Sequence, residues 1–141
     1  MSPQNTSVKA NMKKSAEALE ILFQALADRT RLRLLNLMSG GQVCVCFFIE
    51  VLDEPQPKIS RHLAYLRSAG LVSTSRDGKW ISYGIDPPAH PTARAAFDAV
   101  MAAMNDDREL QRDKAALSRA CCSPRVPEQL RRAPRPHIVR P

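Results

Sequence analysis

The 141-residue chain carries 21 lysines and arginines against 14 aspartates and glutamates, and its formal net charge is +7. This length supports one domain with a modest hydrophobic core, and the positive charge favours a polyanionic partner. The opening segment MSPQNTSVKANMKKS lacks the apolar core of a secretory signal, and no window holds the roughly eighteen apolar residues of a membrane span. We therefore expect a soluble cytoplasmic protein with no membrane partner.

The first part of the chain predicts a polar lead followed by two helices. Residues 1–12 are expected to be disordered, and a folded domain is expected over residues 13–118. Ser15 is suited to cap a first helix, and the apolar stripe of that helix consists of Leu19, Leu22, Phe23 and Leu26. Asp28 is suited to cap a second helix, RTRLRLLNLM, which ends at two glycines.

The middle of the chain predicts two further helices joined by a short link. An almost wholly apolar run from Val43 to Leu52 predicts a third helix, and Pro57 fits the first turn of a fourth. On a wheel of about 100° per residue, the apolar side of the fourth helix consists of Ile59, Leu63 and Leu66. The opposite side consists of Lys58, Arg61, Ala64, Tyr65 and Ser68. One face of this helix is thus expected to be buried and the other basic.

The C-terminal half predicts a hairpin, one more helix and a tail. Two β-type runs, LVSTSR and KWISYGI, are separated by Asp77 and Gly78, a dipeptide that favours the type I′ turn of a two-stranded hairpin. A long fifth helix is expected from about Thr92 to Ala116. Residues 119–141, rich in proline and arginine, are expected to form a flexible tail with two cysteines. The predicted fold class is α+β, with about five helices and a β-hairpin.

The order helix, short link, helix and hairpin is that of a winged helix-turn-helix, whose second helix enters the major groove of DNA. Residues 56–80 contain five lysines and arginines against one aspartate. A basic helix face taken alone is usually just solvated, but the ordered set of elements favours double-stranded DNA as the partner. The candidate DNA-binding residues are Gln56, Lys58, Ser60, Arg61, Tyr65, Arg76 and Lys79. His62 and Trp80 are assigned to packing.

The four cysteines form two close pairs, Cys44 with Cys46 and Cys121 with Cys122. In an intracellular chain this clustering favours metal or redox chemistry over structural disulfides, although cysteine is also common in hydrophobic cores. On a regular helix, residues two apart point about 200° away from each other. One ion bound by both Cys44 and Cys46 would therefore reshape the turn ahead of the DNA-reading helix, which provides a physical switch.

Three segments carry a family resemblance, namely LADRTRLRLLNLM, VCVCFFIEVLDEPQPKISRHLAYLRSAGLV and RDGKWISYGI. In order and spacing they resemble the ArsR/SmtB family of metal-responsive repressors, most of all its arsenical-responsive members. The resemblance implies a homodimer joined mainly through the first and last helices. It also implies that the dimer occupies a palindromic operator and leaves it when an inducer binds.

The resemblance further implies an inducer that contains trivalent arsenic or antimony, which soft sulfur ligands suit. The plasmid-type arsenical sensors of the family carry a third cysteine three residues after the second, where this chain has Ile49. The hypothesis is therefore that Cys44 and Cys46 are joined by Cys121 or Cys122, from the same or the partner subunit. Arsenite, a methylated trivalent arsenical and antimonite all remain candidate inducers.

Several alternatives stay open. A cadmium- or lead-responsive repressor with all four cysteines as ligands is one, and a thiol redox switch is another. A zinc site on the last helix is not expected, because Asp98, Asp106 and Asp107 occur there without a histidine. No enzymatic activity is expected, because the sequence has no Gly-rich phosphate loop, no H-E-x-x-H motif and no nucleophile with a paired histidine. A protein-interaction module whose basic tail binds acidic partners is the alternative outside DNA binding.

Overall fold

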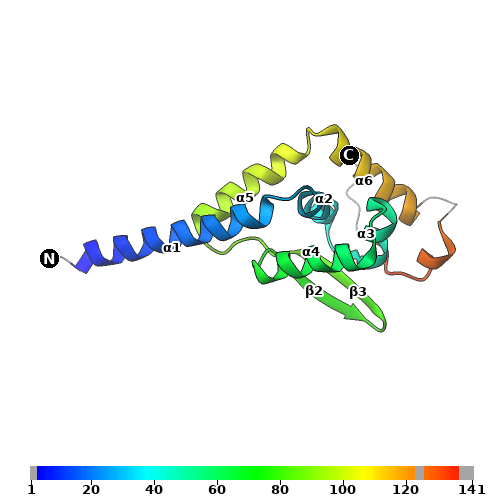
Figure 1. Cartoon of the computed structure of the whole chain (residues 1–141), viewed down its shortest axis with the longest axis horizontal. Coiled ribbons are helices and arrows are strands. Elements are labelled where there is room, and N and C mark those ends of the chain that lie inside the picture. The colour runs from blue at the N-terminus through cyan, green and yellow to red at the C-terminus, as the bar shows by residue number, and fades with distance from the viewer. Residues whose placement is uncertain (1–2, 123–125, 137–141) are drawn as a thin grey trace.

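The computed structural model describes residues 3–122 and 126–136, with side chains described from Ser15 onward except that of Cys122. The α-helices in this part are α1 (Pro3–Leu26), α2 (Arg29–Leu37), α3 (Val45–Leu52), α4 (Gln56–Ser68), α5 (Pro91–Met104) and α6 (Arg108–Cys122). The strands are β1 (Val43–Cys44), β2 (Val72–Asp77) and β3 (Trp80–Ile85), and the 3-10 helices are η1 (Met38–Gly40) and η2 (Glu128–Leu130). Figure 1 shows α1 extending as an arm at one end, with the β2–β3 hairpin projecting from the body.

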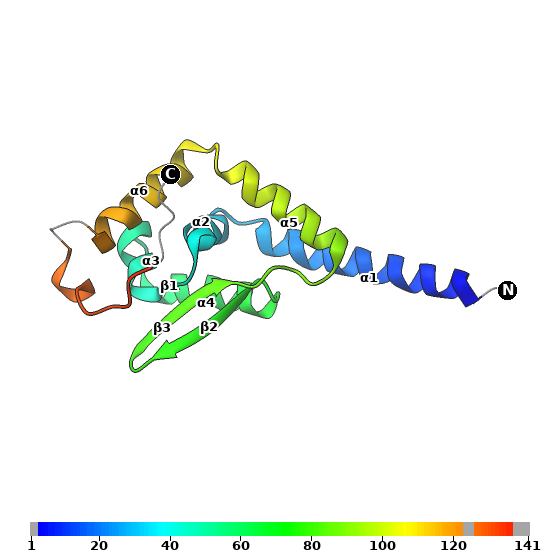
Figure 2. The same cartoon turned by 180° about the vertical axis from the view of Figure 1, so that it is seen from behind.

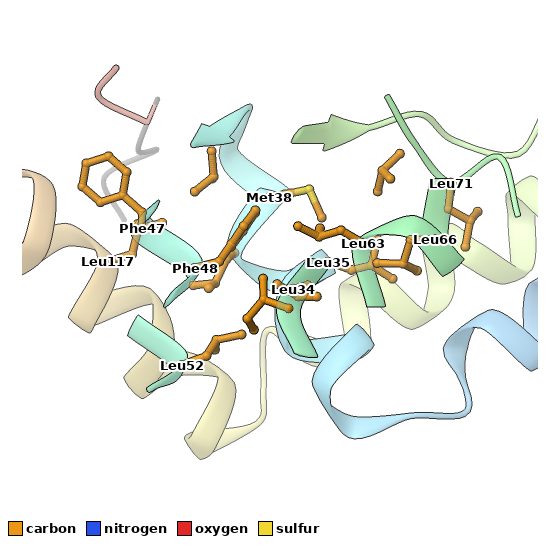
Figure 3. Packing of buried hydrophobic residues seen from close by; sticks show 14 of the residues in the cluster. Leu34, Leu35, Met38, Phe47, Phe48, Leu52, Leu63, Leu66, Leu71 and Leu117 are labelled. Atoms are coloured by element: carbon orange, nitrogen blue, oxygen red, sulfur yellow. The ribbon is translucent and has the colours of Figure 1, made fainter. Parts of the chain in front are cut away.

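The hydrophobic core lies where α2, α3 and α4 meet the sheet and α6. Figure 3 shows this packing, in which Phe48 of α3 lies among leucines of the neighbouring helices. Phe47 and Phe48 are both completely buried, as are the three apolar residues predicted for the inner side of α4. Burial of that whole stripe holds α4 on the body and leaves its opposite side exposed.

The sheet contains the predicted hairpin and one strand that was not predicted. β2 and β3 pair in antiparallel register from Val72↔Ile85 to Asp77↔Trp80, and Gly78 adopts a positive φ of 58° in the turn. β1 pairs with the other side of β3, so that the strand order is β1-β3-β2. A strand of two residues is too short to show the alternation of side chains by which strands are recognised in a sequence.

The long helix predicted near the C-terminus is two helices. The chain leaves helical geometry between Met104 and Arg108, and the carboxylate of Asp107 accepts a hydrogen bond of 3.0 Å from the backbone N–H of Leu110. Asparagine and aspartate compete with helix hydrogen bonds and favour caps, so the sequence Asn105-Asp106-Asp107 ends one helix and starts another. The described part of the chain therefore has six α-helices rather than about five.

The two ends of the chain also differ from the sequence-based picture. α1 begins at Pro3, within the stretch expected to be disordered. Residues 126–136 include the 3-10 helix η2, and both Leu130 and Ala133 are buried in the core cluster. The few apolar residues of this segment are thus enough to anchor it. Of the other residues predicted as tail, 119–122 form the last turn of α6, and 123–125 and 137–141 lie outside the described residues.

A polar clamp joins α6 to α2. Arg33 of α2 donates two hydrogen bonds of 2.8 and 2.9 Å to the carboxylate of Asp113 on α6, whose side chain is 8% exposed. Beside it, the Asn36 side-chain amide donates a 2.9 Å hydrogen bond to the backbone carbonyl of Leu110. Within the described residues, no helix is long and apolar enough to cross a membrane.

Replacing Asp113 with alanine is expected to lower the free energy of unfolding by about 2–3 kcal/mol, because it removes both hydrogen bonds of the largely buried Arg33 guanidinium and leaves, among the described residues, only its 4.0 Å ion pair with Glu109. Urea denaturation followed by circular dichroism measures this. Asp98→Ala is the matched control, because its ion pair with Arg94 is more than half exposed and such pairs contribute less than about 1 kcal/mol. Equal losses in the two variants would contradict a stabilising clamp.

Candidate functional site

α4 is packed on the body by its apolar side, and its opposite side is exposed. Pro57 lies in its first turn, as predicted, and Asp53 at the end of α3 adopts a left-handed conformation with φ of 51° that turns the chain toward α4. Four of the predicted DNA-binding residues on α4 are exposed, namely Gln56, Ser60, Arg61 and Tyr65. Lys58 is half-buried, and its ammonium lies 2.9 Å from the carboxylate of Glu54. The exposed polar side of α4 is therefore free to enter the major groove of a DNA duplex.

The wing carries the remaining two predicted DNA-binding residues. Arg76 and Lys79 are exposed near the tip of the β2–β3 hairpin, and the Lys79 ammonium lies 5.1 Å from the ring centre of Trp80. Trp80 is half-buried and packs against the core cluster, as expected from the sequence. A hairpin tip with two cations beside a reading helix is suited to phosphate contacts.

Arg31 of α2 is a residue that the sequence did not single out. Its guanidinium donates hydrogen bonds of 2.7 and 2.9 Å to the carbonyls of Ala25 and Gln24 at the C-terminal end of α1. The same group lies 4.2 Å from the ring centre of Tyr65 on α4, within cation–π range. Arg31 therefore ties α1 and α2 to the exposed side of α4, and Tyr65 has a structural partner as well as an exposed edge.

His62 is half-buried on α4, which agrees with its assignment to packing. Its Nδ1 lies 3.7 Å from the carboxylate of Asp28, the residue that caps α2 by accepting a 3.0 Å hydrogen bond from the Arg31 N–H. Burial lowers the pKa of His62; Asp28 partly opposes this, and the cations Arg31, Arg61 and Lys58 reinforce it. Although burial raises the pKa of Asp28, the Arg31 N–H and the neighbouring charges lower it overall.

The thermal midpoint of unfolding is expected to fall as pH decreases from about 7.5 to 5.5. An unfolded histidine takes up a proton near pH 6.5, whereas His62 in the folded state has a lowered pKa and takes it up only at lower pH. The unfolded chain thus binds more protons in this window, so stability is retained above it and lost as pH falls. Differential scanning fluorimetry of the parent and of His62→Gln measures this, and an equally steep fall in both would contradict the role of His62.

The two N-terminal cysteines meet, contrary to the prediction from a regular helix. Cys44 belongs to β1 and has extended backbone angles, with φ of −68° and ψ of 142°, while Cys46 lies in the first turn of α3. Because the chain turns from strand to helix between them, their Sγ atoms lie only 3.3 Å apart. The prediction of a helix from Val43 was wrong by two residues, and those two residues decide the geometry of the thiol pair.

The thiol pair is enclosed on one side and accessible on the other. Both cysteines are free; Cys44 is buried and Cys46 is half-buried. Burial, the contact with Cys44 and the charge of Cys44 raise the pKa of the Cys46 thiol to about 12. Cys46 is therefore protonated at neutral pH, and any ion that binds through its sulfur must displace that proton.

Cys121, the member of the C-terminal cysteine pair whose side chain is described, does not join the thiol pair in the structure. Cys121 is buried on α6 and is disulfide-bonded, and the side chain of Cys122 lies outside the described residues. α6 packs against α3, with Leu117 and Phe47 in one cluster (Figure 3). Among the described side chains, no group of three or more histidines, cysteines, aspartates or glutamates is placed to hold a metal ion.

The exposed helix α4, its short connection to α3 and the following wing define a winged helix-turn-helix DNA-binding regulator. Residues 28–74 match the family described as bacterial regulatory protein, arsR family. The chain is also 43% identical over 103 residues to the arsenical resistance operon repressor of Escherichia coli (strain K12), covering 72% of this chain and 86% of that repressor. The chain belongs to the ArsR family of transcriptional regulators.

Other relatives and solved structures agree with this family. Arsenic resistance transcriptional regulator ArsR1 of Pseudomonas putida is 41% identical over 61% of this chain and 65% of its own length. A probable mercury resistance operon repressor of Streptomyces lividans is 40% identical over 74% of each chain. The reduced HlyU structure from Vibrio cholerae has a TM-score of 0.57 at 25% identity, covering 65% of this chain and 94% of that one. The transcriptional repressor BigR from Xylella fastidiosa has a TM-score of 0.54 at 26% identity, and the match covers 67% of this chain and 94% of that one.

Proposed function

We propose that the chain is a homodimeric repressor that binds double-stranded operator DNA through α4 and the wing, and that trivalent arsenic bound at Cys44 and Cys46 releases it. The observation that carries the inducer assignment is the 3.3 Å contact between two free thiols at the start of the helix-turn-helix. The Escherichia coli and Pseudomonas putida relatives, named for arsenical and arsenic resistance, support the same inducer.

The thiol pair suits a soft, pyramidal centre. Two sulfurs bound at about 2.3 Å from one ion, at angles of about 90–110°, lie roughly 3.3–3.8 Å apart. The sulfurs of Cys44 and Cys46 are already at that separation, so chelation by both requires little movement of either. Arsenous acid then exchanges hydroxyl groups for sulfur, and each thiol that bonds to arsenic releases one water molecule.

A third sulfur completes the trigonal arrangement that trivalent arsenic prefers. The candidates are Cys121, once its disulfide is reduced, and Cys122, from the same or the partner subunit. The packing of α6 against α3 brings the helix that carries them to the same side of the molecule as the thiol pair. A methylated arsenical needs one sulfur fewer, because carbon occupies one position.

The DNA-binding proposal is tested with a duplex selected from random DNA by the purified protein. Operator affinity is expected to fall steeply with salt, with a slope of about −0.9 for each phosphate contact, while a preference of about a thousandfold or more over random DNA is kept. Arsenite added under reducing conditions is expected to release this duplex. Binding without sequence preference would instead favour an interaction module with a basic surface.

A second copy of the chain is the proposed partner of α1. Ile21 and Phe23 of α1 are 50% and 53% exposed and are the two most exposed large apolar residues of the described part of the chain, so a partner that covered α1 would remove this apolar surface from water. Phe23→Glu is expected to shift the protein from dimer to monomer in sedimentation experiments and to weaken operator binding at least tenfold. Glu20→Gln on the same helix is the control that leaves the apolar residues in place, and a Phe23→Glu dimer would contradict this interface.

A soft divalent metal is the second candidate inducer, because the Streptomyces lividans relative is named for mercury resistance. Two sulfurs on opposite sides of a linear two-coordinate ion would lie about 4.6 Å apart at metal–sulfur distances of about 2.3 Å. The 3.3 Å separation of the thiol pair therefore suits bent coordination, as in arsenic, cadmium or lead sites, better than linear coordination.

A further inference from the structure

The thiol pair is built into the wing as well as into the helix-turn-helix. Cys44 pairs with Ser82 of β3, and the preceding residue Val43 pairs with Tyr83. β3 is also the strand that forms the wing hairpin with β2. Figure 2 shows β1 alongside β3, with the tip of the hairpin at the edge of the molecule. A movement of the Cys44 backbone therefore acts directly on a strand of the wing.

Gln42, the residue before β1, makes a second connection to the wing. Its side-chain carbonyl accepts a 2.9 Å hydrogen bond from the hydroxyl of Ser75 on β2. To reach β2 it crosses β3 at Gly84, where a Cβ atom would lie only 2.9 Å from the Gln42 side chain. The absence of a side chain at position 84 leaves the space that this crossing requires. Residues 42–44 thus hold both strands of the wing.

We propose that Gln42 is a positioning residue that couples the thiol pair to the wing, so that an ion captured by Cys44 and Cys46 moves Arg76 and Lys79 away from operator phosphates. This inference rests on the proposed inducer site and adds a second route to the one through α3 and α4. Movement of β1 is transmitted through its pairing with β3 and through the Gln42–Ser75 hydrogen bond. The sulfurs of Cys44 and Cys46 are already close enough to bind one ion together. A third ligand that binds the same ion therefore displaces the pair as a unit, and β1 moves with it.

The first test asks whether the inducer effect depends on the wing. The factor by which arsenite weakens operator binding is measured by fluorescence anisotropy for the parent and for Arg76→Gln/Lys79→Gln. If arsenite binding acts on DNA binding through the wing, this factor is at least about fivefold smaller in the variant. The reason is that the variant already lacks the phosphate contacts of Arg76 and Lys79 that arsenite would otherwise break. Lys58→Gln/Arg61→Gln on α4 is the comparison variant: it loses only the part of the factor that is carried through α3 and α4, and adding Gln42→Ala to it lowers the factor by about a further fivefold. An unchanged factor in the wing variant would overturn the proposal.

The second test removes the connection and keeps the wing. Gln42→Ala and Ser75→Ala are each expected to reduce the arsenite factor about fivefold, the effect of losing one hydrogen bond. The double variant should be no worse than either single one, because both changes remove the same bond. Operator affinity without arsenite and the arsenic content per chain should stay within about twofold of the parent. Ser75→Thr retains the hydroxyl and is expected to restore release, and Ser73→Ala is the control on the same strand.

The outcomes separate this inference from the proposed function. If arsenite does not bind the parent, or binds without releasing DNA, the proposed function fails. If the parent is released and Gln42→Ala is released to the same extent, the coupling through Gln42 fails while the inducer site stands. A variant that loses DNA binding before arsenite is added assigns Gln42 to the DNA-binding state itself and contradicts a role in release.

Discussion

Cys44→Ser and Cys46→Ser are each expected to raise the arsenite concentration needed for half-release of the operator by at least about a hundredfold. Each change removes one of the two sulfurs that lie 3.3 Å apart, and a hydroxyl is a far weaker ligand for a soft centre than sulfur. Operator affinity without arsenite should stay within about threefold of the parent, because neither side chain is on the exposed side of α4 or on the hairpin tip. Fluorescence anisotropy at a fixed reductant concentration measures both quantities.

The C-terminal cysteines supply the matched comparison. Cys121→Ser/Cys122→Ser is expected to raise the half-release concentration less for a methylated arsenical than for arsenite, because the methylated compound can be held by two sulfurs. If the double variant responds to arsenite like the parent, Cys121 and Cys122 are not ligands. If Cys44→Ser is released normally, the thiol pair is a packing feature and the inducer binds elsewhere.

The elements with strong local signals could be predicted from the sequence. The hairpin follows from Asp77-Gly78, which sets the turn. The buried side of α4 follows from Ile59, Leu63 and Leu66, because a helix with apolar residues at this spacing has one way to face a core. The cap at Asp28 follows from residue type and position. In each case one to three residues close together in the sequence decide the local structure.

The geometry of the cysteine site could not be predicted in the same way. Whether Cys44 is helical or extended depends on the pairing of β1 with β3, and that pairing joins residues about forty positions apart. The same is true of the crossing of Gln42 at Gly84. Residues far apart in the sequence decide these features, so the local pattern VCVCFF indicated an apolar helix and gave no sign of a strand. Because α3 begins at Val45 and not at Val43, the sulfurs of Cys44 and Cys46 lie together.

The apparent affinity for cadmium is expected to rise about tenfold per pH unit for each protonated thiol that becomes a ligand, between about pH 6 and 8. Cadmium enters as a cation, so each sulfur that was a thiol releases one proton when it binds. Burial and the neighbouring Cys44 raise the pKa of Cys46 to about 12, so this thiol holds its proton throughout the window. Isothermal titration calorimetry in buffers of different ionisation enthalpy counts the released protons.

The affinity for arsenite is expected to change by less than about threefold over the same range. Arsenous acid is neutral here, and each hydroxyl that leaves arsenic takes up one thiol proton to form water, so no net proton is released. A raised thiol pKa therefore weakens the binding of divalent cations at neutral pH and leaves the binding of arsenous acid nearly unchanged. It gives the site a preference for arsenous acid over divalent cations that the number of sulfur ligands alone does not provide. Cys46→Ser should lower by one the number of protons released for each cadmium ion bound. A tenfold fall in arsenite affinity per pH unit would mean that the sulfurs react as thiolates already present in the free protein, because each leaving hydroxyl would then take a proton from solution to form water. The preference would then have to come from coordination geometry.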